Sequence, residues 1–134
     1  MTETRVDGNC INNYILTRVW TATDLCGNSS SSSQTVTVSD NTSPVLSAAP
    51  ASVSAECDAV PTAATLTATD NCGSATVTMT ETRVDGNCIN NYILTRTWTA
   101  TDLCGNSSSS SQTVTVSDNT APVLSAAPAS VSAE

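Results

Sequence analysis

Apolar and polar residues alternate along much of the chain, which is the two-residue period of a β-strand with one buried face. The longest such stretch is residues 92–102, where one face is mostly threonine and the other holds Leu94, Arg96, Trp98 and Ala100. Shorter alternating stretches are residues 51–57, 62–69, 75–84 and 112–117. Gly, Asn, Asp and Pro separate these stretches, and none has the period of a helix. The pattern predicts an all-β fold, a β-sandwich of short strands.

The segments between the predicted strands carry turn signals. Residues 85–87, with the sequence Asp-Gly-Asn, are a good hairpin signal. The serine runs at residues 29–33 and 107–111 lie between two predicted strands. We expect each run to be a solvated hairpin leading into the last strand, in preference to a flexible linker or a glycosylated stalk.

The sequence is internally repeated. Residues 1–56 return as residues 79–134 at an offset of 78, and only two positions differ, Val19 against Thr97 and Ser43 against Ala121. Near-identity at a fixed period is typical of an array in which each repeat is one folded module. The period predicts three parts: the C-terminal part of one repeat (1–39), one complete repeat (40–117) and the N-terminal part of the next (118–134).

The predicted links between repeats are short. Residues 39–44 and 117–122 contain no glycine and each ends at a proline, so neighbouring modules should not tumble freely. The first partners of each module are therefore expected to be the neighbouring repeats of the same chain.

Charge excludes several functions. The net charge is −8, with no His, and the only cations are Arg5, Arg18, Arg83 and Arg96. An acidic surface without lysine argues against binding nucleic acid or anionic membranes, and no apolar run is long enough to span a bilayer. Without imidazole, lysine or a nucleophile–base arrangement, the chain is not expected to be an enzyme.

Cysteine is abundant and indicates disulfides. Six cysteines occur without a CxxC pair, and a small module with a modest core needs such staples in an oxidising, extracellular setting. The complete repeat holds four, for which three connectivities exist. In the leading partial repeat Cys10 and Cys26 have only each other, so we expect the pairs Cys10–Cys26, Cys88–Cys104 and Cys57–Cys72. Each would close a loop of about 15 residues, for roughly 3 kcal/mol.

Three motifs carry a resemblance to a known family. They are residues 99–106 (TATDLCGN), 67–73 (TATDNCG) and 116–123 (VSDNTAPV). They resemble hyalin-type (HYR-like) immunoglobulin-like repeats, and more narrowly the tandem arrays of giant secreted surface proteins of gliding and marine Bacteroidota, including gliding-motility adhesins. The resemblance covers the whole chain. It implies tandem immunoglobulin-like β-sandwich repeats of about 78 residues that are disulfide-stapled, exported (usually by type IX secretion) and displayed on the cell surface for adhesion or as a stalk.

The resemblance also bears on the cysteines. In hyalin repeats the cysteine of the Asp-Asn-Cys-Gly turn pairs with one before the preceding strand, which supports Cys57–Cys72. This chain lacks the outer cysteine pair of the eukaryotic repeats and has Cys88 and Cys104 instead. The second bridge therefore depends on spacing alone.

Few other residues suggest chemistry. Weak calcium candidates lie at strand ends or at the junction, namely Asp70, Asp102, Asp118 and Asn119. Their local density is low for an ion that takes six to eight oxygens, and Asx turns are the alternative. No metal or cofactor is expected.

Two inward-facing charges predict an ion pair. Glu81 and Arg96 share the apolar faces of their strands, and an unpaired buried charge is very costly. We expect a Glu81–Arg96 pair, repeated as Glu3–Arg18, with each guanidinium near a tryptophan, Trp98 or Trp20.

Two function classes remain. The first is a structural repeat that gives reach and stiffness to the stalk or filament of a secreted cell-surface adhesin; near-identical copies without reactive residues favour it. The alternative is a binding module in which each repeat contacts glycan or protein ligands on surfaces or other cells, although each repeat has only one Trp and one Tyr.

Overall fold

The computed structural model describes residues 1–134 and contains only β-strands. The strands are β1 (Thr2–Asp7), β2 (Tyr14–Thr23), β3 (Ser29–Val38), β4 (Val45–Leu46), β5 (Val53–Glu56), β6 (Ala68–Thr69), β7 (Ala75–Asp85), β8 (Tyr92–Asp102) and β9 (Ser107–Ser117). The all-β fold class predicted from the alternation is confirmed. No helix is present that is long and apolar enough to cross a membrane.

Residues 40–117, which we call the complete module, form a sandwich with unequal layers. One layer is a four-stranded sheet in the order β5-β9-β8-β7, in which β5 runs parallel to β9 and the other pairs are antiparallel. The other layer contains the short pair β4–β6. Irregular segments around residues 51 and 61–64 complete this second layer, because their carbonyl groups accept hydrogen bonds from side chains of the large sheet.

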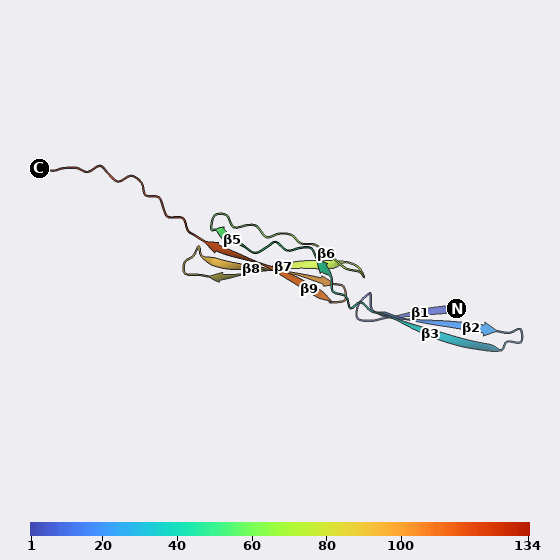
Figure 1. Ribbon diagram of the computed structural model, residues 1–134. Coiled ribbons are helices and arrows are strands. Elements are labelled where there is room, and N and C mark those ends of the chain that lie inside the picture. The colour runs from blue at the N-terminus through green and yellow to red at the C-terminus, as the bar shows by residue number, and fades with distance from the viewer.

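Residues 1–39, which we call the leading unit, form a second copy of the hairpin sheet. Strands β1, β2 and β3 pair in the register of β7, β8 and β9, so that Glu3 faces Arg18 as Glu81 faces Arg96. Figure 1 shows the two sheets following one another along one long axis, with their long strands running roughly along it. Residues 118–134 contain no strand and extend beyond the complete module.

The core lies on the inner face of the large sheet. The buried apolar residues are Leu66, Leu94, Trp98, Ala100, Val114 and Val116, so the inward face of residues 92–102 is the one that the alternation predicted. Trp98 is 1% exposed, whereas its equivalent in the leading unit, Trp20, is 45% exposed. The two indoles occupy the same sheet position, so the difference in their exposed fraction shows how much of Trp98 the second layer of the complete module covers.

The stretch 62–69, predicted as a strand, is strand only at Ala68–Thr69. Side-chain burial still alternates there, with Leu66 buried between two exposed threonines. The backbone differs because carbonyl groups in this stretch and directly before it are taken by side chains: Ala64 O accepts from Trp98 Nε1 at 3.0 Å, and Pro61 O accepts from Arg96. Proline also has no N–H to offer a neighbouring strand. The alternation therefore predicted the buried face correctly, but its prediction of a paired strand over the whole stretch is wrong.

Neither serine run is a hairpin loop: residues 29–33 are the first half of β3, and the run 107–111 is the first half of β9. Its residues pair with β8, and Ser110 lies opposite Trp98 in the register. A serine side chain is small, so this position leaves room for the indole on the inner face. The composition of the run suggested a solvated turn, whereas the run is a strand that lies beside a large residue.

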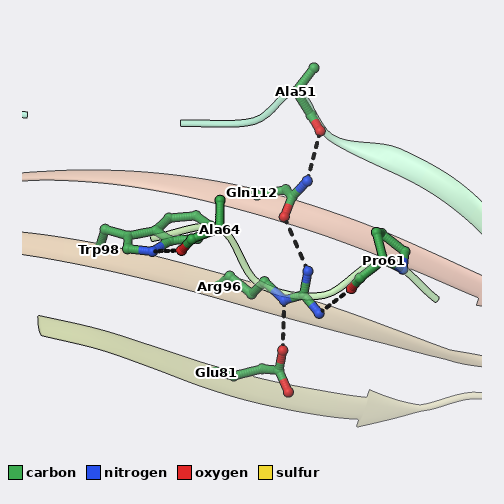
Figure 2. A network of polar contacts seen from close by, with 7 residues as sticks. All are labelled: Ala51, Pro61, Ala64, Glu81, Arg96, Trp98 and Gln112. Atoms are coloured by element: carbon green, nitrogen blue, oxygen red, sulfur yellow. Dashed lines mark hydrogen bonds and ion pairs between the residues drawn. The ribbon is translucent and has the colours of Figure 1, made fainter. Parts of the chain in front are cut away.

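A buried arginine joins the two layers, as Figure 2 shows. Arg96 is 4% exposed and donates from Nε to Glu81 Oε2 at 2.7 Å and from Nη2 to Pro61 O at 2.8 Å. A third, longer contact at 3.4 Å reaches Gln112 Oε1, and Gln112 in turn donates to Ala51 O at 3.0 Å. Three strands and two covering segments therefore meet in one hydrogen-bonded network.

The structure brings together Glu3 and Arg18 in the same way, at 2.7 Å, although in the leading unit both side chains remain exposed. Neither guanidinium makes the cation–π contact with tryptophan that we expected. The cation–π contacts of the chain are made by two other arginines: Arg83 lies over the Tyr92 ring at 3.7 Å, and its counterpart Arg5 lies over Tyr14 at 3.8 Å. Arg96 is held by oxygen acceptors, while the neighbouring indole turns its N–H to Ala64.

The two copies of the ion pair provide a matched test. Arg96→Met removes a buried cation and leaves Pro61 O without its donor. The carboxylate that loses its partner, Glu81, is 39% exposed, so the free energy of unfolding should fall by about 1–3 kcal/mol. Arg18→Met breaks a bond of the same length between side chains that are 37% and 41% exposed, and should cost only about 0–1 kcal/mol. Urea unfolding of the whole chain measures both. Equal losses would show that burial does not set the strength of the pair.

Candidate functional site at the module junction

The most elaborate polar site of the chain lies where the leading unit meets the complete module. Three turns converge there around the link 39–44: the β1–β2 turn (8–13), the β6–β7 turn (70–74) and the β8–β9 turn (103–106). Figure 1 shows this meeting point between the two sheets. We call it the junction.

The β1–β2 turn is shaped by a glycine. Gly8 donates its N–H to Asn13 O at 2.7 Å, and a Cβ at this position would lie 2.7 Å from that same oxygen. Gly86 repeats the arrangement with Asn91. Any side chain would therefore push the turn open, and this turn is the element that carries Cys10.

A disulfide crosses the junction. Cys10 in the β1–β2 turn is bonded to Cys104 in the β8–β9 turn, with their Cα atoms 5.1 Å apart and a sequence separation of 94. The bond therefore joins the leading unit to the complete module, and it closes a loop for which chain entropy predicts about 4–5 kcal/mol of stabilisation.

The expected pairs Cys10–Cys26 and Cys88–Cys104 are therefore wrong. Cys10 and Cys26 lie in the turns at opposite ends of the ten-residue strand β2, which spans about 33 Å. Cys88 and Cys104 are separated by β8 in the same way. A disulfide needs Cα atoms within about 7 Å, so no hairpin of this length can join its own two turns.

The expected pair Cys57–Cys72 is also not formed, and both thiols are free in the structure. Cys57 follows Glu56, which pairs with Ser117 at one end of the sheet. Cys72 precedes β7, whose first residue Ala75 pairs with Asp102 at the other end. The same constraint applies: the two cysteines lie at opposite ends of the complete module. Cys26 and Cys88 are free and exposed.

Hydrogen bonds fix the link to both of its neighbours. Asp40 is 3% exposed; its N–H donates to Asn13 Oδ1 at 2.7 Å, and its carbonyl accepts from Asn106 Nδ2 at 3.1 Å. Asn12 Nδ2 donates to the carbonyl of Cys72. One side chain of the leading unit and one of the complete module therefore hold the link, and a second side chain of the leading unit holds the β6–β7 turn, which restricts bending.

An acidic cluster lies inside the junction. Ligand atoms of Asp40, Asp70 and Cys72 all lie within 4.8 Å of one another, and one carboxylate oxygen of each aspartate accepts no hydrogen bond from the protein. Burial raises the pKa of the Cys72 thiol, and the negative charges of Asp40 and Asp70 raise it further. Two carboxylates and one thiol are too few ligands for calcium, which takes six to eight oxygens, so these three residues do not by themselves make a calcium site.

The four calcium candidates do not form one site. Asp70 and Asp102 lie at the junction end of the complete module, whereas Asp118 and Asn119 lie at its far end, where Asn119 donates two hydrogen bonds to Glu56. Asp70 meets Asp40 instead, a residue that the sequence reasoning omitted. The repeat contained the necessary signal, because Asp40 is the equivalent of Asp118 at an offset of 78.

Asp102 organises the turn that carries Cys104. Burial of its carboxylate disfavours the charged form, but hydrogen bonds from the Asn106 side chain and from the N–H groups of Asn106, Cys104 and Gly105 outweigh burial, so the pKa of Asp102 lies below its usual value. In the leading unit, hydrogen bonds from Asn28, side chain first and then backbone, lower the pKa of Asp24 in the same turn. The Asx turn is therefore the local function of these aspartates.

The disulfide can be tested with a matched pair of substitutions. Cys104→Ser removes the crosslink and should lower the free energy of unfolding by about 4–5 kcal/mol under non-reducing conditions. Cys26→Ser alters the equivalent residue in the leading unit, which is unpaired and exposed, and should change it by less than about 0.5 kcal/mol. Urea unfolding distinguishes the two. A comparable loss in both variants would indicate pairing within hairpins.

Acid should weaken the fold through Asp102. Its folded-state pKa is depressed, so its stabilising effect is complete above the unfolded value of about 3.9 and is lost as the pH falls through the lower folded value. The midpoint of guanidinium unfolding should be flat between about pH 5 and 7 and should fall below about pH 4. Asp102→Asn should lower the midpoint at neutral pH and reduce the acid slope. An unchanged acid slope would contradict the assignment.

Comparison with protein families places the module in a known group. Residues 45–116 match the HYR-like domain with 4 cysteines, and that range, which is more than half of the chain, contains Cys57, Cys72, Cys88 and Cys104. A search of curated proteins finds no match. The all-β fold and the disulfide agree with an extracellular immunoglobulin-like module. The chain belongs to the family of HYR-like domains with four cysteines.

Proposed function

We propose that this chain is part of a stiff, extended stalk or filament of a secreted cell-surface adhesin, with each 78-residue repeat as one structural unit. The observation that supports this most directly is the junction, where the Cys10–Cys104 disulfide and the hydrogen bonds to Asp40 hold successive units end to end. A crosslink at this position carries tension from one unit to the next without relying on the link alone.

The direction of the strands supports a role in reach. The long strands β7, β8 and β9 have 11 residues each and run roughly along the axis on which the two sheets follow one another. Eleven strand residues span about 36 Å, so each repeat should extend the array by roughly 35–45 Å. A unit of this shape therefore adds a large length to the array for the number of residues that it contains.

The finer assignment comes from the sequence motifs. Their resemblance to the arrays of giant gliding and marine Bacteroidota surface proteins supports a gliding-motility type of adhesin, exported by the type IX route. The net charge of −8 keeps neighbouring rods apart by repulsion and disfavours binding to nucleic acid or anionic membranes. We propose no enzymatic activity, because the chain has neither histidine nor lysine to move a proton, and the Asp102 carboxylate at the junction is engaged in hydrogen bonds that build its turn.

A binding role remains the second candidate, and one observation favours it. A shallow, mostly apolar hollow lies on the sheet beside the exposed residues Val84 and Ile93, and the same hollow recurs beside Val6 and Ile15. A ligand that contacts each repeat through this surface would gain from many copies along one chain.

Electron microscopy of arrays with increasing numbers of repeats tests the stalk. The contour length should grow linearly by roughly 35–45 Å per added repeat, and the particles should be straight rods. Compact coils, or a length independent of repeat number, would contradict the proposal.

The same arrays, made without any terminal domain, separate the two candidate functions on glycan arrays and whole cells. A stalk should show no specific binding. Saturable binding that is lost in a Val84→Asp, Ile93→Asp variant would favour the binding module.

A further inference from the structure

The free cysteines of the complete module are divided between its two ends. Cys72 lies at the junction end, together with the bonded Cys104. Cys57 and Cys88 lie at the far end, next to the last residues of β9 and in the β7–β8 turn, respectively. Each end therefore presents two cysteines to whatever module adjoins it.

The disulfide at the junction is a template for the far end. Cys10 is the equivalent of Cys88 at an offset of 78, and it is bonded to Cys104 of the module that follows it. In an array that continues with the same period, Cys88 therefore meets the Cys104 equivalent of the next module. This bond repeats a contact that is already present.

The two ends hold the same aspartate in the same way. Asp40 at the junction donates its N–H to Asn13 Oδ1 at 2.7 Å and accepts from Thr42 N at 3.2 Å. Its equivalent Asp118 at the far end donates to Asn91 Oδ1 at 2.9 Å. Asp118 also accepts from Thr120 N at 3.2 Å. The matching contacts allow the two ends to be compared directly.

Each of the remaining two thiols lies beside one of these equivalent aspartates. The Cys72 sulfur lies within 4.8 Å of the nearest Asp40 carboxylate oxygen. At the far end, Cys57 follows Glu56, whose carboxylate binds Asn119, the neighbour of Asp118. The charge of Asp118 acts on the Cys57 thiol and, after burial, is the next cause that raises its pKa. One aspartate thus has a cysteine of its preceding module on one side and a cysteine of its following module on the other.

An asparagine shows how the far end changes when a module adjoins it. At the far end, Asn90 Nδ2 donates to Asp118 Oδ2 at 3.2 Å. At the junction its equivalent, Asn12, donates to the backbone carbonyl of Cys72. The Cys72 equivalent of a following module should therefore arrive at Asn90, next to Asp118 and Cys57.

We propose that Cys57 forms a disulfide with the Cys72 equivalent of the following module, so that two disulfides connect every pair of neighbouring repeats. All four cysteines of a repeat are then used between modules and none within a module. The proposal rests on the tandem arrangement of the proposed stalk. It gives the repeat a reason to carry four cysteines, two at each end.

The bond forms by oxidation of two thiols. Each thiol loses one proton and one electron, the two sulfurs join, and the two electrons and two protons pass to a disulfide oxidant such as oxidised glutathione, which becomes two thiols. The raised pKa of both thiols slows exchange of the free cysteines, since the thiolate is the reactive form. Docking of the two modules brings the pair together.

A chain extended by one repeat tests the proposal. A copy of residues 57–117 is added after Glu134, which is the equivalent of Glu56, and the chain is refolded with oxidised and reduced glutathione. Unpaired cysteines are counted by mass, as glutathione adducts plus alkylated thiols. Four unpaired cysteines are expected, namely Cys26, Cys72 and the two far-end cysteines of the added copy.

Other counts overturn the proposal and identify what failed. Six unpaired cysteines would show that only the Cys10–Cys104 type of bond forms, which removes the Cys57 bond and leaves the proposed stalk intact. A count of zero unpaired cysteines would show pairing within modules, which contradicts the crosslinked stalk as well.

Cys57→Ser provides a matched control. In the extended chain it should raise the count of unpaired cysteines by one, because the partner in the added copy is released. The same substitution at the Cys57 equivalent of the added copy should lower the count by one, because that thiol has no partner. Segmental isotope labelling of the added copy distinguishes its peptides in the mass map, and a peptide joining Cys57 to the Cys72 of its own module would refute the assignment.

Discussion

The length of the strands is the constraint on which the rest of this structure depends. Strands β2 and β8, with ten and 11 residues, place the two turns of each hairpin more than 30 Å apart. Groups in those turns cannot reach each other within a module, so they interact with the next unit instead. The disulfide Cys10–Cys104, the hydrogen bond from Asp40 N–H to Asn13 and the hydrogen bond from Asn12 to the Cys72 carbonyl are all consequences of this separation.

Within the module, side chains replace much of the second sheet. Covering segments with little regular pairing would leave carbonyl groups unsatisfied against an apolar sheet, which is costly. Arg96 and Trp98 satisfy two of them, at Pro61 and Ala64, and Gln112 satisfies a third at Ala51. A buried cation is acceptable here because the Glu81 carboxylate and two neutral oxygens, Pro61 O and Gln112 Oε1, accept its hydrogen bonds. The network also fixes where each covering segment lies, since each carbonyl has one donor.

The leading unit shows what this second layer contributes. Its sheet has the same register and, apart from Val19 in the place of Thr97, the same residues at the paired positions, yet its tryptophan and its ion pair are exposed. The backbone geometry of the hairpin therefore comes from local sequence and strand pairing. The burial of Trp98 and Arg96, and with it most of their contribution to stability, comes from residues 44–67 folding over the sheet.

The sequence by itself determined the strands, their inward faces and the repeat. A two-residue period is a local property of an extended chain, so the alternation at residues 92–102 identified the buried face, including Arg96. The partner Glu81 was identified correctly, but its side chain is 39% exposed because β7 is the edge strand of the sheet. The same reasoning failed at residues 62–69, because side-chain alternation does not report which groups take the backbone hydrogen bonds. It failed for the serine run because a run of serines was interpreted as a solvent-exposed turn. In the structure these small residues lie in a strand beside Trp98.

Only the tertiary structure decided the cysteine pairing and the junction. A spacing of about 15 residues was interpreted as a loop that could close, whereas most of those residues form a rigid strand. Asp40 was missed although the period relates it to Asp118, because its role depends on three turns that are distant in sequence. Contacts of this kind depend on how one unit stacks on the next, and stacking is set by the ends of the module, where local periodicity carries no information.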